Sequence, residues 1–286
     1  MDTILTKDQL PLALERIERW NQGGKSYLME RSLKEEQNGQ NVFEFAVDRW
    51  PDFSIMMLMP IKDSIPLSLE HFINFVVDEE TSTEADVKEK LLKMKPGGFK
   101  TISFLNNYSK YKSILKDVFQ AWNMPAMLSI TLETLVASET SVKTFTLPDG
   151  YIVDELQESD AELVTSHWEF ANENSFPFVH YNIKNFPNVA VRSKEDGSLV
   201  AWEITYFMGA MGILYVMENH RGRGLAKFVI YELAKKLGRE GHDAFCWIEE
   251  SNKASIGLHL KCGFTIANQC YFTKLKGSSK EGEAVE

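Results

Sequence analysis

The second half of the chain alternates between short runs of β-type residues and longer stretches with helical spacing. Strands are predicted at 151–156, 188–192, 199–207, 211–217 and 244–249, with two short strands within 264–275. Helices are predicted at 160–170, 175–185, 225–240 and 253–262, where apolar residues recur every three or four positions. This alternation predicts a mixed sheet with helices on its faces, in the α/β (α+β) class.

The first half mixes the same two patterns in a different order. Helical spacing predicts helices at 11–20, 70–77, 84–94 and 110–122. Extended runs predict strands at 42–47, 53–59, 101–105 and 127–132, and a turn at 49–52 joins the first two. Pro96, Gly97 and Gly98 favour a plain turn over a ligand loop.

A turn signal, Leu147-Pro148-Asp149-Gly150, separates the two halves. The chain has 286 residues, which suits two domains, since one domain commonly holds roughly 100 to 200 residues. We therefore expect domains at 1–147 and 148–276. Residues 277–286 are small, polar and charged, which predicts a disordered tail.

The composition disfavours several classes of function. The net charge is -10, whereas nucleic acids and anionic lipids both attract clustered Lys and Arg. Uninterrupted apolar runs fall short of the roughly 18 residues that a membrane helix needs. Three cysteines without a CxxC pair, and without histidines at zinc-ligand spacing, indicate no metal site and favour a reducing compartment. No nucleic-acid, membrane or metal partner is expected, and no cleaved presequence is evident.

The motif with the clearest chemistry is the glycine-containing loop Arg221-Gly222-Arg223-Gly224-Leu225-Ala226, between a strand and a helix. Such a turn leaves several backbone N–H groups directed at one spot, where the helix dipole adds positive potential. Arg221, Arg223 and Lys227 add positive charge on an acidic protein. The loop predicts an anion site, although by itself it is also compatible with an ordinary solvated turn.

The residues around and after this loop resemble a known superfamily. Arg221-x-x-Gly224-x-Ala226 resembles the acyl-CoA-binding signature of the GNAT superfamily of N-acyltransferases. The stretch 252–264, N-K-A-S-I-G-L-H-L-K-C-G-F, resembles the second signature of that superfamily, usually N-x-x-A-x-x-L-Y-x-K-x-G-F. The two signatures occur in the expected order, and the resemblance covers about 150–275. It implies a GNAT fold for the second domain.

A second resemblance covers most of the chain, since segments at 48–53, 186–192, 200–205 and 218–221 look like parts of the glycine N-acyltransferase family. That family joins a GNAT-like N-terminal domain to a catalytic GNAT domain, each a mixed, mostly antiparallel sheet flanked by helices. The resemblance implies transfer of an acyl group from acyl-CoA to the amino group of glycine or a related amino acid, by direct attack on the thioester. It implies a mitochondrial location, otherwise a cytoplasmic one, and we expect a monomer or weak dimer.

The resemblance also implies how acyl-CoA binds. The strands at 211–217 and 244–249 would part, so that the pantetheine arm pairs with free backbone groups, and a backbone N–H of the first strand would be the oxyanion donor. The residues implied to bind acyl-CoA are Leu214, Tyr215, Val216, Arg221, Gly222, Arg223, Gly224, Leu225, Ala226, Asn252 and Ser255. No metal is implied.

The catalytic positions depart from the family pattern. His259 stands where many superfamily members have a tyrosine general acid, and an imidazole is suited to proton transfer, although a passive role is equally open. The glutamate base of the family falls at or near Ala210, which has no carboxylate. Glu203 and Glu218 are the candidate substitutes.

Two other functions stay open at this point. A GNAT acetyltransferase could act on a protein or polyamine amine. The missing glutamate could instead mark a CoA-binding protein with little turnover. If the acceptor is glycine, Arg192 and Lys194 are candidate partners for its carboxylate.

Overall fold

The computed structural model describes residues 3–20, 25–39, 41–61, 71–93, 101–173 and 175–276. Contacts divide the chain into two compact units. The N-terminal unit is Met1–Leu132 with Gln269–Glu286, and the C-terminal unit is Glu133–Asn268. The turn at 96–98 and the tail at 277–286, for which the sequence made predictions, lie outside the described residues.

The N-terminal unit contains a sheet of order β1-β2-β3-β4-β5-β12-β6. Its strands are β1 (Thr3–Ile4), β2 (Phe43–Val47), β3 (Ile55–Pro60), β4 (His71–Val77), β5 (Thr101–Asn106) and the parts of β6 (Ala126–Ala137) and β12 (Thr265–Lys276) that fall in this unit. Its helices are α1 (Leu10–Trp20), α2 (Tyr27–Gln37), α3 (Glu84–Lys93) and α4 (Lys112–Ala121). β4 and β5 run parallel, whereas β1 to β4 and the β5–β12 pair are antiparallel.

Two expectations for secondary structure are wrong, and one helix was not predicted. The segment expected as a helix at 70–77 is strand β4, whose apolar side chains are buried on both faces, and periodicity cannot separate such a run from a buried helix. Helix α2 was not expected, because polar Arg31, Ser32 and Glu36 share its buried positions and hide the apolar stripe. The two short strands expected within 264–275 form one strand, β12.

The C-terminal unit contains a sheet of order β6-β11-β10-β9-β8-β7. Its strands are β7 (Tyr151–Asp154), β8 (Asn188–Ser193), β9 (Leu199–Thr205), β10 (Met211–Val216), β11 (Ala244–Glu249) and the end of β6. Its helices are α5 (Ala161–Ser166), α6 (Ser175–Asn185), α7 (Leu225–Arg239) and α8 (Lys253–Lys261). β10 and β11 run parallel and β7 to β10 are antiparallel, so both units have the mixed, mostly antiparallel sheet that was predicted.

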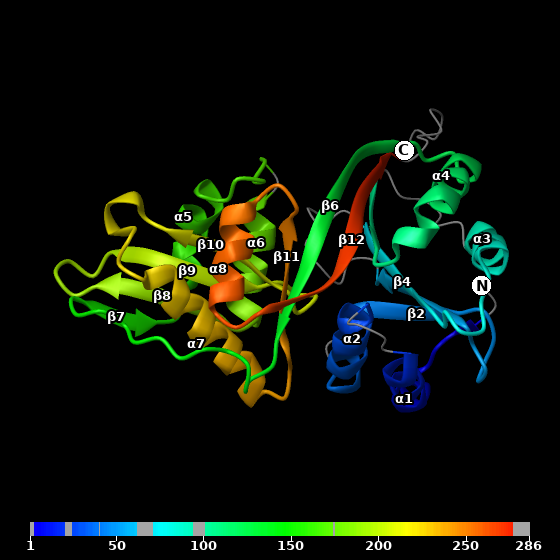
Figure 1. Ribbon diagram of the computed structural model, residues 1–286, viewed down its shortest axis with the longest axis horizontal. Helices are drawn as coiled ribbons and strands as arrows, with labels where there is room; N and C mark the ends of the chain where they lie inside the picture. The colour runs from blue at the N-terminus through cyan, green and yellow to red at the C-terminus, as the bar shows by residue number, and fades with distance from the viewer. Residues whose placement is uncertain are drawn as a thin grey trace, which may run out of the picture. The chain divides into compact units, whose positions relative to one another are not determined.

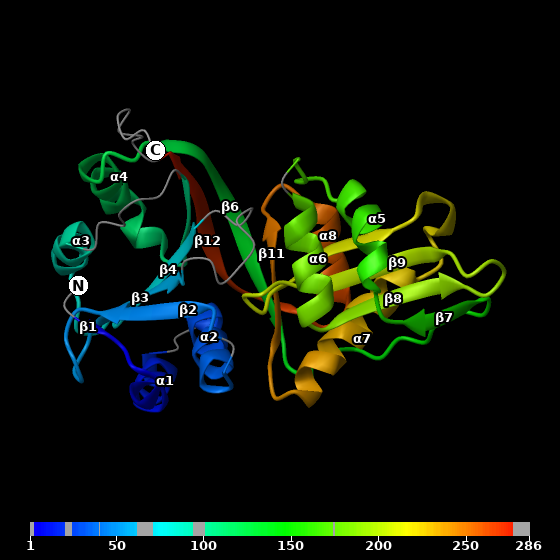
Figure 2. The same cartoon turned by 180° about the vertical axis from the view of Figure 1, so that it is seen from behind.

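Helices cover both faces of the C-terminal sheet. Helices α7 and α8 lie in front of it in Figure 1, and α5 and α6 lie in front of it when the molecule is turned in Figure 2. Adjacent strand residues point to opposite faces, so the two helix pairs contact different side chains of the same strand. The faces are called the α7/α8 face and the α5/α6 face below.

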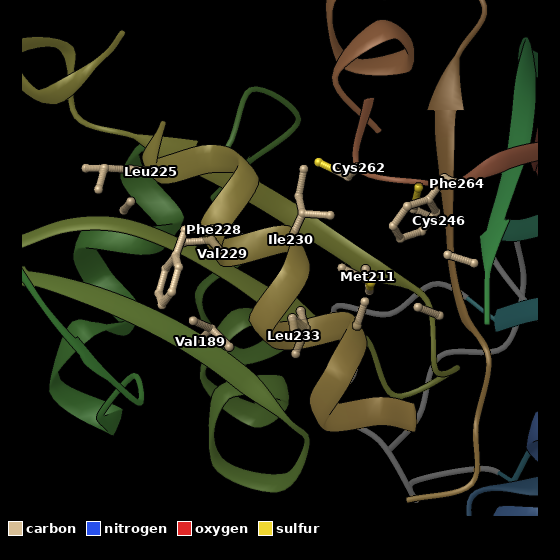
Figure 3. Packing of buried hydrophobic residues seen from close by; sticks show 14 of the residues in the cluster. Val189, Met211, Leu225, Phe228, Val229, Ile230, Leu233, Cys246, Cys262 and Phe264 are labelled. Atoms are coloured by element: carbon tan, nitrogen blue, oxygen red, sulfur yellow. The ribbon is translucent and has the colours of Figure 1, made fainter. Parts of the chain in front are cut away.

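The core under α7 holds the C-terminal unit together. Figure 3 shows Phe228, Val229 and Leu233 of α7 with Val189 of β8 and Met211 of β10. All five are buried, and burial of such side chains contributes about 1.5 to 3 kcal/mol each. This packing fixes the start of α7 directly after the end of β10, where the glycine loop lies.

The domain limits predicted from the sequence differ from the limits of the compact units. The turn at Leu147 lies further along the chain than the division after Leu132. Strand β6 begins in the N-terminal unit and ends in the C-terminal unit, and the chain returns to the N-terminal unit at Gln269, within β12. Among the described residues, no helix is long and apolar enough to cross a membrane.

Candidate active site

Strands β10 and β11 of the C-terminal unit separate beyond a single point of contact. Their parallel register consists of one pair, Met211 with Cys246, and both residues are buried. Further along β10, Leu214, Tyr215 and Val216 are only half-buried, although β10 is an interior strand and its neighbour β9 is buried throughout. A central strand that loses one partner leaves backbone N–H and C=O groups open to a ligand. The two strands therefore frame an opening with its closed end at Met211 and Cys246.

A bulge shapes β10 at this opening. The register with β9 shifts between Gly212 and Tyr215, and Ile213 has a φ of 52°, which is rare for a β-branched residue. Bulges redirect backbone groups and often occur near functional sites. The bulge here turns the outer half of β10 away from the pairing with β11.

The glycine loop lies between the end of β10 and the first turn of α7. Gly222 and Gly224 have φ values of 77° and 85°, a region that favours glycine, and no other group lies within 4 Å of where a Cβ would be. Gly224 is the N-cap of α7, and no side chain caps the helix start. The first N–H groups of this 15-residue helix are therefore available to an anion, together with the positive end of its dipole.

The basic side chains of the loop have different contacts. The Arg221 Nε donates to the Val216 carbonyl oxygen at 3.1 Å, and its guanidinium lies over the Tyr215 ring. Arg223 donates to the Tyr151 hydroxyl at 2.8 Å, and this hydroxyl is also 2.9 Å from Nδ1 of His220. Arg221 is thus held against the end of β10, whereas Arg223 connects the loop to β7.

Glu203 and His259 are brought together on the α7/α8 face. Glu203 on β9 is 1% exposed and His259 on α8 is 3% exposed. The His259 Nε2 lies 4.0 Å from Oε1 of Glu203. Neither Glu203 Oε2 nor His259 Nε2 has a hydrogen-bond partner among the described residues. Buried polar atoms without partners are rare in folded proteins, and this pair therefore has capacity to bind or move a proton.

The position of His259 is fixed from the other side of its ring. Its Nδ1 is 2.9 Å from the Ser255 carbonyl oxygen, which only accepts hydrogen bonds, so Nδ1 carries a proton. Nε2 is the nitrogen that gains or loses the second proton. The ring edge also packs at right angles on Phe264.

The surroundings raise the pKa of both groups. Burial raises the pKa of the Glu203 carboxyl, because the charged form loses water, and His259 offsets only part of this effect. Burial lowers the pKa of His259, but the neighbouring Cys246 and Glu203 side chains outweigh it, and the His259 pKa lies well above its ordinary value. The pair therefore keeps its protons to higher pH than either group does in water.

Asn252 and Ser255, which the sequence implies as cofactor-binding residues, have structural contacts in α8. Asn252 is the N-cap of α8, and its Oδ1 accepts a hydrogen bond from the Ser255 N–H at 3.0 Å. The Ser255 carbonyl holds His259. Both residues therefore support the position of His259.

Other candidate residues lie apart from this pair or are already paired. Glu218 is exposed on the loop and forms its ion pair with Arg221. Ala210 is buried, and its carbonyl accepts from the Tyr206 N–H. Arg192 is paired with Asp154 and Asp160, so a substrate carboxylate would have to displace two acids. This makes Arg192 a poor partner for glycine.

Sequence reasoning missed three residues at this site. Cys246 lies at the closed end of the opening and beside His259. Tyr206 follows β9, and Tyr151 joins the loop to β7 through its hydroxyl. No motif contains them, and only the strand pairing brings them to the site. Among the described residues, no group of three His, Cys, Asp or Glu side chains is placed to hold a metal ion.

Comparison with known proteins agrees with this geometry. The FR47-like protein family matches residues 188–273, which contain β8 to β11 and most of β12. Glycine N-acyltransferase from Bos taurus is 25% identical over 227 residues, covering 72% of this chain and 76% of the relative. The Homo sapiens glycine N-acyltransferase is 23% identical over 227 residues, covering 73% of this chain and 76% of the relative.

Solved structures show the fold. A Drosophila protein of 17% identity has a TM-score of 0.76, covering 96% of this chain and 97% of that chain. A tandem GNAT protein from the clavulanic acid biosynthesis pathway has a TM-score of 0.55 at 11% identity, covering 98% and 99%. Two GNAT-like units in one chain are thus found in a solved structure of the same length. The chain is a GNAT-fold protein similar to the glycine N-acyltransferases, which confirms the resemblance predicted from its sequence.

Proposed function

We propose that the protein transfers an acyl group from acyl-CoA to the amino group of glycine or a related small amino acid. The observation that carries this proposal is the parting of β10 and β11 directly before the uncapped start of α7. The pyrophosphate of CoA would bind the N–H groups at Gly222, Gly224 and Leu225, and the pantetheine arm would run between the strands. Its thioester would then lie close to the closed end of the opening.

The acyl-CoA contacts follow from this placement. Backbone groups of Leu214, Tyr215 and Val216 would pair with the pantetheine amides, because β11 does not pair with this part of β10. An N–H from this part of β10 would donate a hydrogen bond to the carbonyl oxygen and so stabilise the negative charge that develops on it. Arg221 and the small Ala226 suit a phosphate group near the helix start.

We assign the proton transfers to Glu203 and His259. The neutral amine attacks the thioester carbon and loses its proton to the Glu203 carboxylate, directly or through water. The C–S bond breaks, and the CoA thiolate takes the proton from Nε2 of His259. A proton then passes from Glu203 to His259, 4.0 Å away, which restores the pair. The net products are the amide and free CoA thiol, with no change in oxidation state.

The comparisons support this proposal only at the level of the reaction. The relatives named glycine N-acyltransferase suggest glycine as acceptor. The mitochondrial location stays an expectation from the family resemblance of the sequence. The paired state of Arg192 gives no support to that residue as the carboxylate partner. The acceptor is therefore the least constrained part of the proposal.

A thiol-release assay with a panel of acyl-CoAs and amines tests the proposal. The amines should include glycine, other small amino acids, a lysine peptide and spermidine. CoA thiol and the matching N-acyl amino acid, identified by mass, are expected to appear in equal amounts. Acylation of the peptide or spermidine alone would favour the broader acetyltransferase function. Tight CoA binding without any amide would indicate a binding protein.

A further inference from the structure

Tyr206 occupies the space over the bulge of β10. A Cβ placed on Gly212 would lie 2.4 Å from Cε2 of Tyr206 and 2.5 Å from its hydroxyl oxygen. The ring therefore rests directly on the Gly212 backbone, and only glycine leaves room for it. Because the residue is half-buried, part of its surface stays open.

The ring lies on the α5/α6 face of the sheet. It stacks on Phe178 of α6, with ring centroids 5.5 Å apart and an angle of 21° between the planes. Phe178 also contacts Phe207 edge to face. Tyr206 is thus held between a helix and the bulge, which limits its freedom to swing away.

The hydroxyl of Tyr206 lies against the bulge itself, 2.5 Å from where a Cβ on Gly212 would be. Burial raises the pKa of Tyr206 well above its ordinary value, so the group is a neutral phenol at any physiological pH.

The acyl group of a bound thioester would point toward this ring, an argument that rests on the proposed function. Under that proposal the sulfur would face His259 on the α7/α8 face, and the carbonyl oxygen would face an N–H of β10. The closed end of the opening is filled by the buried pair Met211 and Cys246. The α5/α6 face, where Tyr206 lies, is the direction left for the acyl chain.

We propose that Tyr206, seated on Gly212, is the residue that limits the length of the acyl group and selects short acyl-CoA such as acetyl- or propionyl-CoA. A longer chain would have to displace a ring that is packed against Phe178 and against the Gly212 backbone. Forcing extra methylenes into a packed site is costly, whereas a short chain ends before it reaches the ring.

The test compares acetyl-, propionyl-, butyryl- and hexanoyl-CoA in the wild type, Tyr206→Phe and Tyr206→Ala. For each thioester we would measure kcat/KM with the best acceptor of the amine panel. Binding affinity would be measured by calorimetry. The wild type is expected to lose about tenfold or more in kcat/KM between acetyl- and hexanoyl-CoA. Tyr206→Phe keeps the ring and the preference, and Tyr206→Ala removes the preference. Tyr181→Ala, a half-buried tyrosine of α6, is the matched control and should leave the preference unchanged.

Equal use of acetyl- and hexanoyl-CoA by the wild type would overturn the inference, as would an unchanged preference in a folded Tyr206→Ala. If the thioesters bind but none is turned over, the proposed function fails. The affinities of the four acyl-CoA compounds then still test whether Tyr206 limits the acyl length. Weaker binding of hexanoyl-CoA than of acetyl-CoA in the wild type, relieved in Tyr206→Ala, then supports it, and equal binding contradicts it. Thermal unfolding confirms that each variant is folded.

Discussion

The pair of Glu203 and His259 is our proposed substitute for the missing general base. The position implied for the general base holds Ala210, yet a carboxylate reaches the site from the preceding strand. Both side chains are buried with unpartnered atoms, a costly arrangement that folding alone does not require. The proposed role in proton transfer would account for these buried polar atoms.

Replacing His259 by Phe should separate chemistry from binding. We expect kcat to fall by about a hundredfold or more, because the leaving thiolate loses its proton donor, while CoA affinity changes little. Turnover is measured by thiol release and CoA binding by calorimetry. His180→Phe, at a half-exposed histidine of α6, is the control and should leave both unchanged. A normal rate in folded His259→Phe would show that His259 has only a packing role.

The raised pKa values of the pair predict how stability depends on pH. A group whose pKa is higher in the folded state holds more protons there, so its contribution is full below the unfolded pKa and is lost as pH rises through the folded one. Both Glu203 and His259 have raised pKa values. The free energy of unfolding should therefore fall as pH rises above the ordinary carboxyl range. Glu203→Gln with His259→Asn should flatten this slope in denaturant unfolding across pH, and a slope that persists would contradict the assigned directions.

The loop between β10 and α7 is the part of the candidate site whose structure was best predicted from the sequence. Two glycines, a strand before them and an amphipathic helix after them predict the turn from local rules, and α7 begins where expected. The opening between β10 and β11 is different, because it depends on strand register, which no short segment encodes. Strand β4 was misread since burial on both faces removes alternation. Tyr206 was missed for the same reason as the opening, whereas Glu203 was a candidate from the sequence and its pairing with His259 needed the structure.

Gly224→Val should weaken CoA binding with little harm to folding. No group lies within 4 Å of the added Cβ, so the cost is backbone strain of about 1 to 2 kcal/mol at a φ of 85°. Relief of that strain would turn the helix-start N–H groups away from the phosphate, and we expect CoA affinity to drop about tenfold or more. Calorimetry measures it, with Arg221→Ala added to test the nearby cation.

Gly197→Val is the matched control for that change. Gly197 also has a positive φ, 75°, with open space at its Cβ, but it lies in the turn between β8 and β9. It should lose similar stability in thermal unfolding and keep normal CoA affinity. Equal CoA affinity of the Gly224→Val and Gly197→Val variants would show that the glycine loop is not part of the CoA site.

The two units of the molecule repeat one plan but differ where a ligand would bind. In the N-terminal unit the parallel strands β4 and β5 stay paired over four positions, from His71 with Ile102 to Asn74 with Leu105. The turn that follows β4 contains Asp78, Glu79 and Glu80 in place of glycines and arginines. A closed strand pair and an acidic turn are both unfavourable for a CoA pyrophosphate.

One CoA should therefore bind per chain. Calorimetric titration is expected to give a stoichiometry of one, and Gly224→Val should weaken that single event. A stoichiometry of two, with one site insensitive to Gly224→Val, would show that the N-terminal unit binds CoA as well.

The path of the chain through its two units has a consequence for synthesis on the ribosome. Strand β5 pairs with β12, whose residues emerge only after the whole C-terminal unit has been made. At roughly 5–20 residues per second, on the order of ten seconds separates the two strands. The unit that starts first must therefore wait with an unpaired strand edge, which is open to aggregation or to chaperones. The C-terminal unit is itself complete only at Asn268, a few residues before the paired part of β12, so the edge of β5 stays open until synthesis reaches Tyr271.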